Sequence, residues 1–215
     1  MKIGVIGANG NLGSRIVKQA LDREIDVKAF VYRGVCLEQR VESVEKNLFD
    51  LLINDIQDLD VIISAFGGGF KTDPIINKQA FVKYIELLEN TEKKLITIAG
   101  AGSLYTDGSH ILYEYQSDKH PEKLKEISKN IRLGVDEIEK KKNFNWTVVC
   151  PSRRFDLEGA YTGEYLVGQN CEIIYNDDGQ SYVTYEDLAK AMLDIAEKNL
   201  YKHQIVTIAS KKGGQ

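Results

Sequence analysis

Short apolar runs alternate with longer amphipathic stretches along this chain of 215 residues. The run at 61–65 is nearly continuous in apolar residues, which is typical of a strand that is buried on both faces of a parallel sheet. Because strands and helices alternate, the pattern predicts an α/β fold with a doubly wound, mainly parallel sheet and helices on both faces. The predicted strands lie at residues 2–6, 27–32, 43–48, 61–65, 94–99, 146–150 and 205–208.

Four helices are predicted where apolar residues recur at helical spacing. The first follows a glycine-rich turn, the second starts at Pro74, and the third starts at Pro121. Gly134 within the third helix indicates that a neighbouring element approaches the backbone closely at this point. The fourth helix follows Thr184 and Asp187, which resemble a capping box with Asp in place of Glu.

The chain is predicted to form a single domain over residues 1–215, because no Pro-rich or charged linker divides it. Residues 151–183 contain short extended pieces and turns instead of a clear helix or strand period. We expect this part to form a small irregular cap on the substrate side of the sheet. Both a monomer and a homodimer are compatible with the sequence.

Composition and charge exclude several classes of protein. The 28 basic and 32 acidic residues give a net charge of −4, so the chain lacks the basic excess that favours nucleic-acid binding. Its apolar runs are shorter than the about 20 residues that a membrane-spanning helix requires. The three cysteines and three histidines lack the spacing of a disulfide framework or a metal site, so we expect no metal and a cytoplasmic location.

Gly7, Gly10 and Gly13 stand between the first predicted strand and the first helix. At this position Gly7 permits a sharp turn, Gly10 lets the backbone approach a pyrophosphate, and Gly13 lets the helix pack on the strand. The free N–H groups at the start of the helix then face the phosphates. The turn therefore predicts a dinucleotide site, with a purely structural glycine turn as the alternative. The residues expected at the cofactor are Gly7, Asn9, Gly10, Asn11 and Leu12.

The second predicted strand ends without the Asp or Glu that binds the ribose 2′-hydroxyl of NAD. Arg33 stands there instead, and its guanidinium can pair with a 2′-phosphate, assisted by Arg15 or Arg40. NADP(H) is therefore the preferred cofactor. NAD(H) is also compatible, because an Arg without a repulsive carboxylate at this position does not exclude it. The alternative is that Arg33 is a solvated loop residue.

Two further segments are expected at the cofactor. Asp50 follows the third strand, where it can accept a hydrogen bond from the adenine amino group while Leu51 packs on the ring. The alternative for Asp50 is the N-cap of the short helix that follows. The fourth strand closes with small residues that let the chain pass beside the ribose and diphosphate, since ligands of open α/β sheets bind at the carboxyl ends of strands. The residues expected here are Ala65, Phe66 and Gly67.

Six stretches of the sequence carry a resemblance to a known family. They are residues 1–16 (MKIGVIGANGNLGSRI), 63–67 (ISAFG), 100–104 (GAGSL), 146–152 (WTVVCPS), 162–165 (TGEY) and 185–189 (YEDLA). They are similar to the atypical short-chain dehydrogenases/reductases that bind NAD(P)H, and most closely to the bacterial NADH-flavin reductase group, which is related to biliverdin IXβ/flavin reductase and NmrA-like proteins. The resemblance implies a Rossmann-type sheet and a nicotinamide cofactor. It also implies that Gly100 and Pro151 lie at the cofactor and Ser103 at the substrate.

The sequence departs from this family at two places. Gly34-Val35-Cys36 stands where relatives often have Asn-Pro, and Pro151-Ser152-Arg153-Arg154-Phe155 stands where many have Pro-Ala-Ala-Phe-Phe. Arg153 and Arg154 are candidates to receive an anionic substrate such as a flavin phosphate or the propionates of a tetrapyrrole. Alternatively, one of them pairs with Asp156 or Glu158 and the other lies in solvent. Tyrosines at the substrate side line an aromatic pocket or anchor loops; they are Tyr105, Tyr113, Tyr115, Tyr161 and Tyr165.

Tyr115 and Lys119 have the Tyr-x-x-x-Lys spacing that short-chain reductases use for proton transfer. That pair must lie on one face of a helix, yet Pro121 predicts that the helix begins only afterwards. Tyr115, Lys119 and Arg153 are therefore weak candidates for catalysis.

The resemblance implies an NAD(P)H-dependent reductase that passes hydride to a planar acceptor such as a flavin, a linear tetrapyrrole (bilin) or a quinone. Such acceptors take up hydride when they are stacked on the nicotinamide, so positioning does most of the work and no acid–base pair is needed. One alternative is a non-catalytic, NmrA-like sensor that binds NADP(H). Another is an epimerase or dehydratase of the extended short-chain reductase type.

Overall fold

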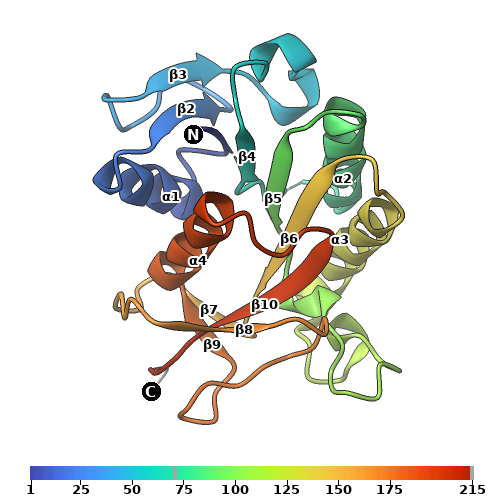
Figure 1. The fold of residues 1–215 in the computed structure, drawn as a ribbon. Coiled ribbons are helices and arrows are strands. Elements are labelled where there is room, and N and C mark those ends of the chain that lie inside the picture. Colours follow the sequence, from blue (N-terminus) through green and yellow to red (C-terminus); the bar gives the residue numbers. More distant parts are fainter. Residues whose placement is uncertain (70–71, 214–215) are drawn as a thin grey trace.

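A computed structural model describes residues 1–69 and 72–213 and contains a central sheet of eight strands in the order β3-β2-β1-β4-β5-β6-β10-β8 (Figure 1). Seven strands are parallel, and only the edge strand β8 runs antiparallel to its neighbour β10. This arrangement confirms the predicted doubly wound, mainly parallel sheet. The strands are β1 (Lys2–Ile6), β2 (Asp26–Val31), β3 (Glu42–Glu45), β4 (Val61–Ser64), β5 (Lys94–Ile98), β6 (Asn145–Pro151), β8 (Tyr165–Gly168) and β10 (Gln204–Ser210).

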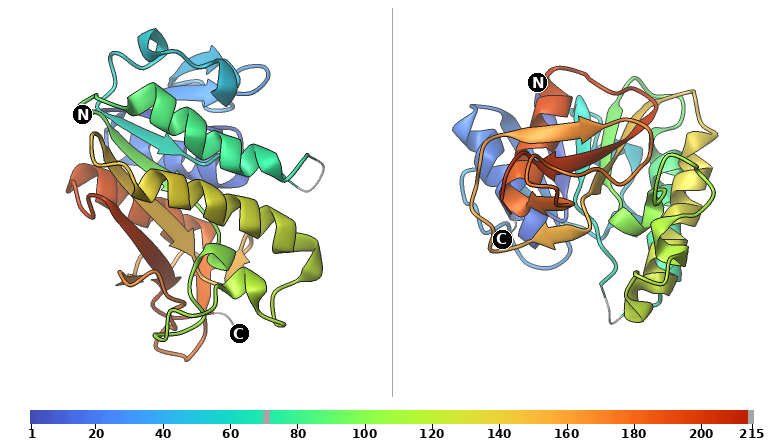
Figure 2. Two further views of the ribbon diagram at one scale, coloured as in Figure 1. Left: turned by 90° about the vertical axis from the view of Figure 1, so that its right-hand side faces the viewer. Right: turned by 90° about the horizontal axis from the view of Figure 1, so that it is seen from below.

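Helices cover both faces of the sheet. α1 (Asn11–Asp22) and α4 (Tyr185–Glu197) lie on one face, and α2 (Ile75–Leu88) and α3 (Glu122–Glu139) lie side by side on the other (Figure 2). β1 supplies apolar side chains to both cores: Ile3 packs with α1 and α4, whereas Ile6 packs with α2 and α3. Among the described residues, no helix combines the length and the apolar character needed to cross a membrane.

The segment 151–183 is more regular than the sequence predicts. β7 (Arg154–Asp156) pairs with β9 (Tyr182–Thr184) in a separate two-stranded sheet, and β8 extends the central sheet. The prediction missed β8 because its four residues are only half-buried and do not show a clear alternation of apolar and polar positions. Only the loops between these strands are irregular.

Asp187 fastens this segment to α4. Thr184 caps α4 by accepting the N–H of Asp187 at 3.0 Å, which confirms one half of the predicted capping box. The Asp187 carboxylate does not bond back to Thr184 but accepts hydrogen bonds from Thr162 Oγ1 at 2.8 Å, the Gly163 N–H at 3.0 Å and Ser210 Oγ at 2.5 Å. The carboxylate of Asp187 therefore fixes the loop that precedes β8 instead of completing the capping box.

Gly134 lies where α3 crosses α2. A Cβ at this position would lie 2.4 Å from Cδ2 of Phe81 on α2, so the two helices pack as closely as a glycine allows. The close contact that the sequence predicts at Gly134 is therefore made by the ring of Phe81. α3 begins at Glu122, directly after Pro121, as predicted.

The contact between Gly134 and Phe81 can be tested by a double substitution. Gly134→Ala should lower the free energy of unfolding by about 1–3 kcal/mol, because overpacking costs more than the roughly 1 kcal/mol that Ala contributes over Gly in a helix. Urea denaturation measures the change. In a Phe81→Ala background, which removes the Cγ and Cδ2 atoms that the new Cβ would meet, the same substitution should be neutral or stabilising, and an equal loss in both backgrounds would contradict the contact.

Candidate functional site

The turn between β1 and α1 has the geometry that its glycines predict. Gly7 has a φ of +77°, which favours glycine, and its carbonyl oxygen accepts the N–H of Gly10 at 2.9 Å. A Cβ on residue 13 would lie 2.1 Å from the Gly7 oxygen, so Gly13 permits α1 to pack directly on the end of β1. A Cβ on Gly10 would meet only the Gly7 oxygen, at 3.1 Å, and the space around Gly10 is otherwise open.

The start of α1 can bind an anion. Gly10 is its N-cap and offers no capping side chain, so the first amides of the helix have no acceptor within it. The first turn of α1 also carries no acidic residue. Unpaired amides and the positive end of the helix dipole together attract a phosphate.

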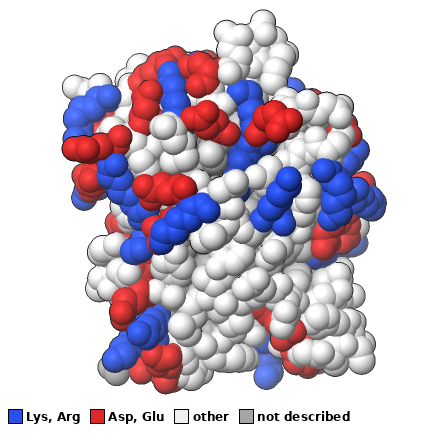
Figure 3. All heavy atoms as spheres, viewed as in Figure 1, with Lys and Arg blue, Asp and Glu red and all other residues white. Residues whose placement is uncertain are grey.

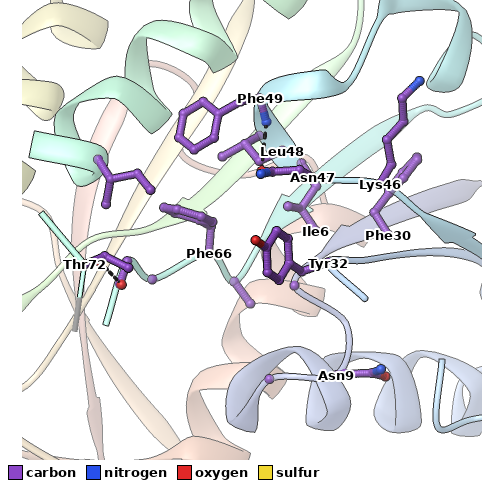
Figure 4. A pocket seen from close by; sticks show the side chains of 16 residues that line it. Ile6, Asn9, Phe30, Tyr32, Lys46, Asn47, Leu48, Phe49, Phe66 and Thr72 are labelled. Carbon is purple, nitrogen blue, oxygen red and sulfur yellow. Dashed lines mark hydrogen bonds between the residues drawn. The ribbon is translucent and has the colours of Figure 1, made fainter. Parts of the chain in front are cut away.

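A first cavity of about 380 Å³ lies between this turn and the ends of β2 and β3. Figure 4 shows Tyr32, Phe49 and Phe66 gathered around it from three different elements. The rings of Phe49 and Phe66 meet edge to face, with centroids 5.9 Å apart. Flat apolar walls of this kind suit a purine ring, and the cavity adjoins the anion-binding start of α1.

The loop after β2 is fastened to the glycine turn by Asn9. Its side-chain amide donates to the Val35 carbonyl at 2.9 Å and accepts the Leu37 N–H at 3.0 Å. This loop carries Arg33, whose guanidinium lies 5.0 Å from the ring centroid of Tyr32; Tyr32 lines the first cavity, and Arg33 does not. Arg33 is exposed and has no carboxylate partner among the described residues.

The two arginines expected to assist Arg33 are engaged elsewhere. Arg40 pairs with Glu38 at 2.8 Å. Arg15 pairs with Glu186 of α4 at 3.2 Å and donates to the Leu157 carbonyl at 3.2 Å, on the side of α1 that faces α4. The prediction of an assisting role is wrong for both, because nearer acceptors hold their guanidinium groups.

The residues of the segment after β3 that line the first cavity precede the predicted Asp50 and Leu51 by a few positions. β3 ends at Glu45, earlier than predicted, so a short 3-10 helix (Leu48–Asp50) follows and is capped by Asn47 instead of Asp50. Leu51 is completely buried, and neither Asp50 nor Leu51 lines the cavity. The lining residues from this segment are Lys46, Asn47, Leu48 and Phe49.

A second cavity of about 460 Å³ opens on the other side of the turn. Ala65, Phe66 and Gly67, at the end of β4, line both cavities, as the cofactor prediction requires of them. Gly10 is also shared, and Asn11 and Leu12 line the second cavity. Further lining residues come from the end of β5, from β7 and from α2, α3 and α4; they include Asn77, Tyr84, Thr97, Ile98, Ile131, Phe155 and Tyr185.

Hydrogen bonds within the protein satisfy the polar groups under this cavity. Tyr84 is fully buried, and its hydroxyl lies 2.6 Å from Ser64 Oγ. Burial raises the pKa of Tyr84 to about 12, so this phenol is neutral at physiological pH. Asn77 accepts the Gly68 N–H at 3.2 Å and so fixes the chain after β4.

Arg153 and Arg154 line neither cavity. Arg153 forms two hydrogen bonds of 2.8 Å with the carboxylate of Glu114, which is itself buried, and a third with the Tyr175 hydroxyl. Arg154 pairs with Asp156 at 3.2 Å, as one alternative expected. Arg153 therefore joins the loop after β5 to the segment after β6, and we assign neither arginine to a substrate.

The predicted substrate tyrosines anchor loops. Tyr105 and Tyr113 stack with centroids 4.4 Å apart, and His110 stacks on Tyr105 at 4.5 Å. The Tyr165 hydroxyl donates to Asp194 at 2.8 Å. None of the three tyrosines lines a cavity, because each packs against side chains of its own neighbourhood.

The remaining predicted residues lie outside the cavities. Ser103 is completely buried, and neither Gly100 nor Pro151 is a lining residue. Tyr115 lies in a short 3-10 helix (Glu114–Gln116) and Lys119 follows it before α3 begins, so they do not share a helix face. In the described part of the chain, no group of three or more His, Cys, Asp or Glu residues gathers as metal ligands do.

Sequence reasoning identified Phe66 and missed the other aromatic residues of both cavities. Tyr32 and Phe49 stand next to the residues that were predicted, at the ends of β2 and β3. Phe155 and Tyr185 come from distant parts of the chain and meet only in the fold. Aromatic residues at the end of a predicted strand or a few residues beyond it are the signal that identifies Tyr32 and Phe155.

Charges of both signs mix on the face shown in Figure 3. Oppositely charged side chains also pair in the molecule: Lys2 of β1 lies 3.1 Å from Glu42 of β3 and 2.7 Å from Asp58, which precedes β4. Few charged side chains lie over β10 and β8 in this view. This face therefore presents no broad field of one sign.

Known proteins resemble the chain along nearly its whole length. A family model described as NAD(P)H-binding matches residues 7–199. The uncharacterized protein YwnB of Bacillus subtilis (strain 168) is 31% identical over 213 residues, which cover 98% of this chain and 99% of that protein. A solved structure from Streptococcus pneumoniae TIGR4, provisionally named an NADH-flavin reductase, has a TM-score of 0.90 at 31% identity and covers 98% of this chain and 100% of its own. A Bacteroides thetaiotaomicron structure, provisionally named an epimerase, has a TM-score of 0.85 at 24% identity over 100% of this chain and 99% of its own; it shows the fold alone.

Substitutions at two glycines separate binding from folding. Gly10→Val should weaken NADPH binding by at least about 100-fold, roughly 3 kcal/mol, because a branched side chain would occupy the space before the helix amides. The fold should persist, since Gly10 has extended backbone angles (φ −73°, ψ 167°) that other residues adopt. Gly13→Val should instead unfold the protein, because its Cβ collides with backbone. Calorimetric titration and circular dichroism measure both effects, and unchanged NADPH affinity in Gly10→Val would remove the phosphate site from this turn.

Proposed function

The chain belongs to the NAD(P)H-binding family, and we propose that it is an NAD(P)H-dependent reductase that passes hydride from the nicotinamide to a planar acceptor such as a flavin, a bilin or a quinone. The observation that carries this proposal is the pair of cavities that meet at the phosphate-binding turn. A dinucleotide has two ring-bearing halves joined by a diphosphate, and two cavities on either side of one anion site match this arrangement.

The residues fit the cofactor in one direction. The first cavity offers aromatic walls, and Arg33 lies beside one of them, the ring of Tyr32; this suits an adenosine with or without a 2′-phosphate. Gly10, Asn11 and Leu12 would hold the diphosphate through their backbone amides. The second cavity, between the ends of β4 and β5, would then receive the nicotinamide and leave room for an acceptor.

The chemistry of the second cavity favours hydride transfer to an acceptor that needs no proton relay. Among its described lining residues there is no Asp, Glu, His, Lys or Cys, and burial raises the pKa of its two tyrosines, Tyr84 and Tyr185, so neither forms the phenolate that takes up a proton. Epimerisation and dehydration require a group that takes up a proton within reach of the substrate. A stacked planar acceptor requires mainly the correct distance and orientation, which apolar walls provide. This difference favours a reductase over an epimerase or dehydratase.

The reductase is further proposed to be a cytoplasmic protein that prefers NADP(H). Cys36, Cys150 and Cys171 are all free thiols, which suits a reducing compartment. Arg33 supports the cofactor preference, because a guanidinium pairs with a 2′-phosphate and gains nothing comparable from a ribose hydroxyl.

Anaerobic assays test the function. The purified protein should oxidise NADPH with at least one of FMN, riboflavin, menadione and biliverdin. The loss of the absorbance of the reduced nicotinamide measures this reaction. Oxygen is excluded so that reduced flavin does not return to the oxidised form. Tight NADPH binding without oxidation by any acceptor would contradict a reductase and favour an NmrA-like sensor.

Arg33→Ala tests the cofactor preference. It should weaken NADPH binding by about 1.5–3 kcal/mol, or roughly 10- to 150-fold in Kd, because a charge-assisted hydrogen bond to the 2′-phosphate is lost. NADH binding should be almost unchanged. Arg40→Ala is the matched control, since Arg40 is a nearby arginine that is paired with Glu38. Equal losses for NADPH and NADH in Arg33→Ala would exclude the 2′-phosphate role.

A further inference from the structure

Two stacked aromatic rings form part of the second cavity's wall. Phe155 of β7 and Tyr185 at the start of α4 both line the cavity, and their ring centroids lie 3.6 Å apart with 4° between the ring planes. We call them the Phe155–Tyr185 pair. All other described residues that line this cavity come from residues 10–131. The pair is therefore the contribution of the C-terminal third of the chain to the cavity.

Arg15 holds the pair against α1, the helix that begins at the phosphate-binding turn. Its guanidinium lies 5.6 Å from the ring centroid of Tyr185. The same group pairs with Glu186 at 3.2 Å and donates to the Leu157 carbonyl at 3.2 Å. Arg15 thus fixes the chain close to each member of the pair, so the distance from the pair to the turn is set by side chains that pack and bond around it.

Tyr185 carries an unused hydrogen-bond donor. The other polar side chains well inside the cavity wall, Asn77, Tyr84 and Thr97, bond to partners within the protein. Tyr185 makes no hydrogen bond with the described residues, and burial raises the pKa of its hydroxyl, which keeps it protonated at neutral pH. The side chain of Asn11 also makes no hydrogen bond with the described residues, but Asn11 belongs to the helix start at which the diphosphate is proposed to bind.

On the basis of the proposed reductase function, we propose that the Phe155–Tyr185 pair is the wall against which the hydride acceptor lies. The acceptor ring packs on Phe155, and the Tyr185 hydroxyl donates a hydrogen bond to a carbonyl oxygen of the acceptor. A conjugated ring system with a carbonyl group, such as an isoalloxazine or a quinone, has both features. Because no cationic side chain is among the described residues that line the cavity, recognition does not require a phosphate on the acceptor.

A binding experiment without turnover tests this wall. The protein is saturated with NADP⁺, which has no hydride to give, and titrated with riboflavin, whose fluorescence is quenched when its ring stacks on an aromatic side chain. Phe155→Leu should weaken riboflavin binding by about 3- to 10-fold because an aromatic contact is lost. Tyr185→Phe should keep the stack and still weaken binding by about 3- to 10-fold, because only the hydroxyl is removed. Tyr161→Phe is the matched control, since Tyr161 is an exposed tyrosine of the same third of the chain and lines neither cavity.

Affinity for NADP⁺, measured by calorimetry, should stay within about twofold of wild type in all three variants. FMN should bind to the wild-type protein no more than about threefold tighter than riboflavin does. The proposed role of the Phe155–Tyr185 pair is contradicted if riboflavin affinity is unchanged in both Tyr185→Phe and Phe155→Leu. It is also contradicted if these substitutions weaken NADP⁺ binding instead of riboflavin binding. FMN binding far tighter than riboflavin binding overturns the neutral character of the site. If neither riboflavin nor menadione binds to wild-type protein saturated with NADP⁺, the proposed reductase function is contradicted, and so is the role of the Phe155–Tyr185 pair that rests on it.

Discussion

The carbonyl oxygen of Gly7 occupies the place that a side chain on residue 13 would need, since a Cβ there would lie 2.1 Å away. α1 therefore begins directly against the end of β1, and the candidate site depends on this close approach. It brings the unpaired amides of the helix start beside Ala65 and Gly67 at the end of β4, where the two cavities share residues. A longer connection would move the anion-binding amides away from both cavities.

The two cavities differ in their walls, and the difference gives the bound cofactor a direction. Aromatic rings line the first, and the exposed guanidinium of Arg33 lies beside one of them, Tyr32, which suits a charged adenosine half. The described walls of the second have no ionisable side chain except two tyrosines, Tyr84 and Tyr185, and burial raises the pKa of both. A space with neutral walls suits transfer of a hydride between stacked rings.

Local patterns predict this fold well and the site only in part. The glycine turn was identified because its function depends on three residues that are close in sequence, and the sheet because each buried strand is a compact apolar run. The sequence places Asp50 near the adenine, but β3 ends at Glu45 and the following short helix begins earlier, so Asp50 does not line the cavity. Arg153 is a candidate for an anionic substrate from the sequence, because its partner, Glu114, lies 39 residues away along the chain and no local pattern indicates their ion pair. Phe155 meets Tyr185 only through folding, so no local pattern indicates their stacking.

The central claim is that a dinucleotide lies across the turn, with its adenosine in the first cavity and its nicotinamide in the second. A crystal structure of the protein with NADP⁺ tests it most directly. We expect the diphosphate at the amides of Gly10, Asn11 and Leu12, the adenine between Tyr32 and Phe66, and the nicotinamide in the cavity lined by Thr97 and Tyr185. A diphosphate away from the start of α1, or a cofactor bound in the opposite direction, would contradict this account.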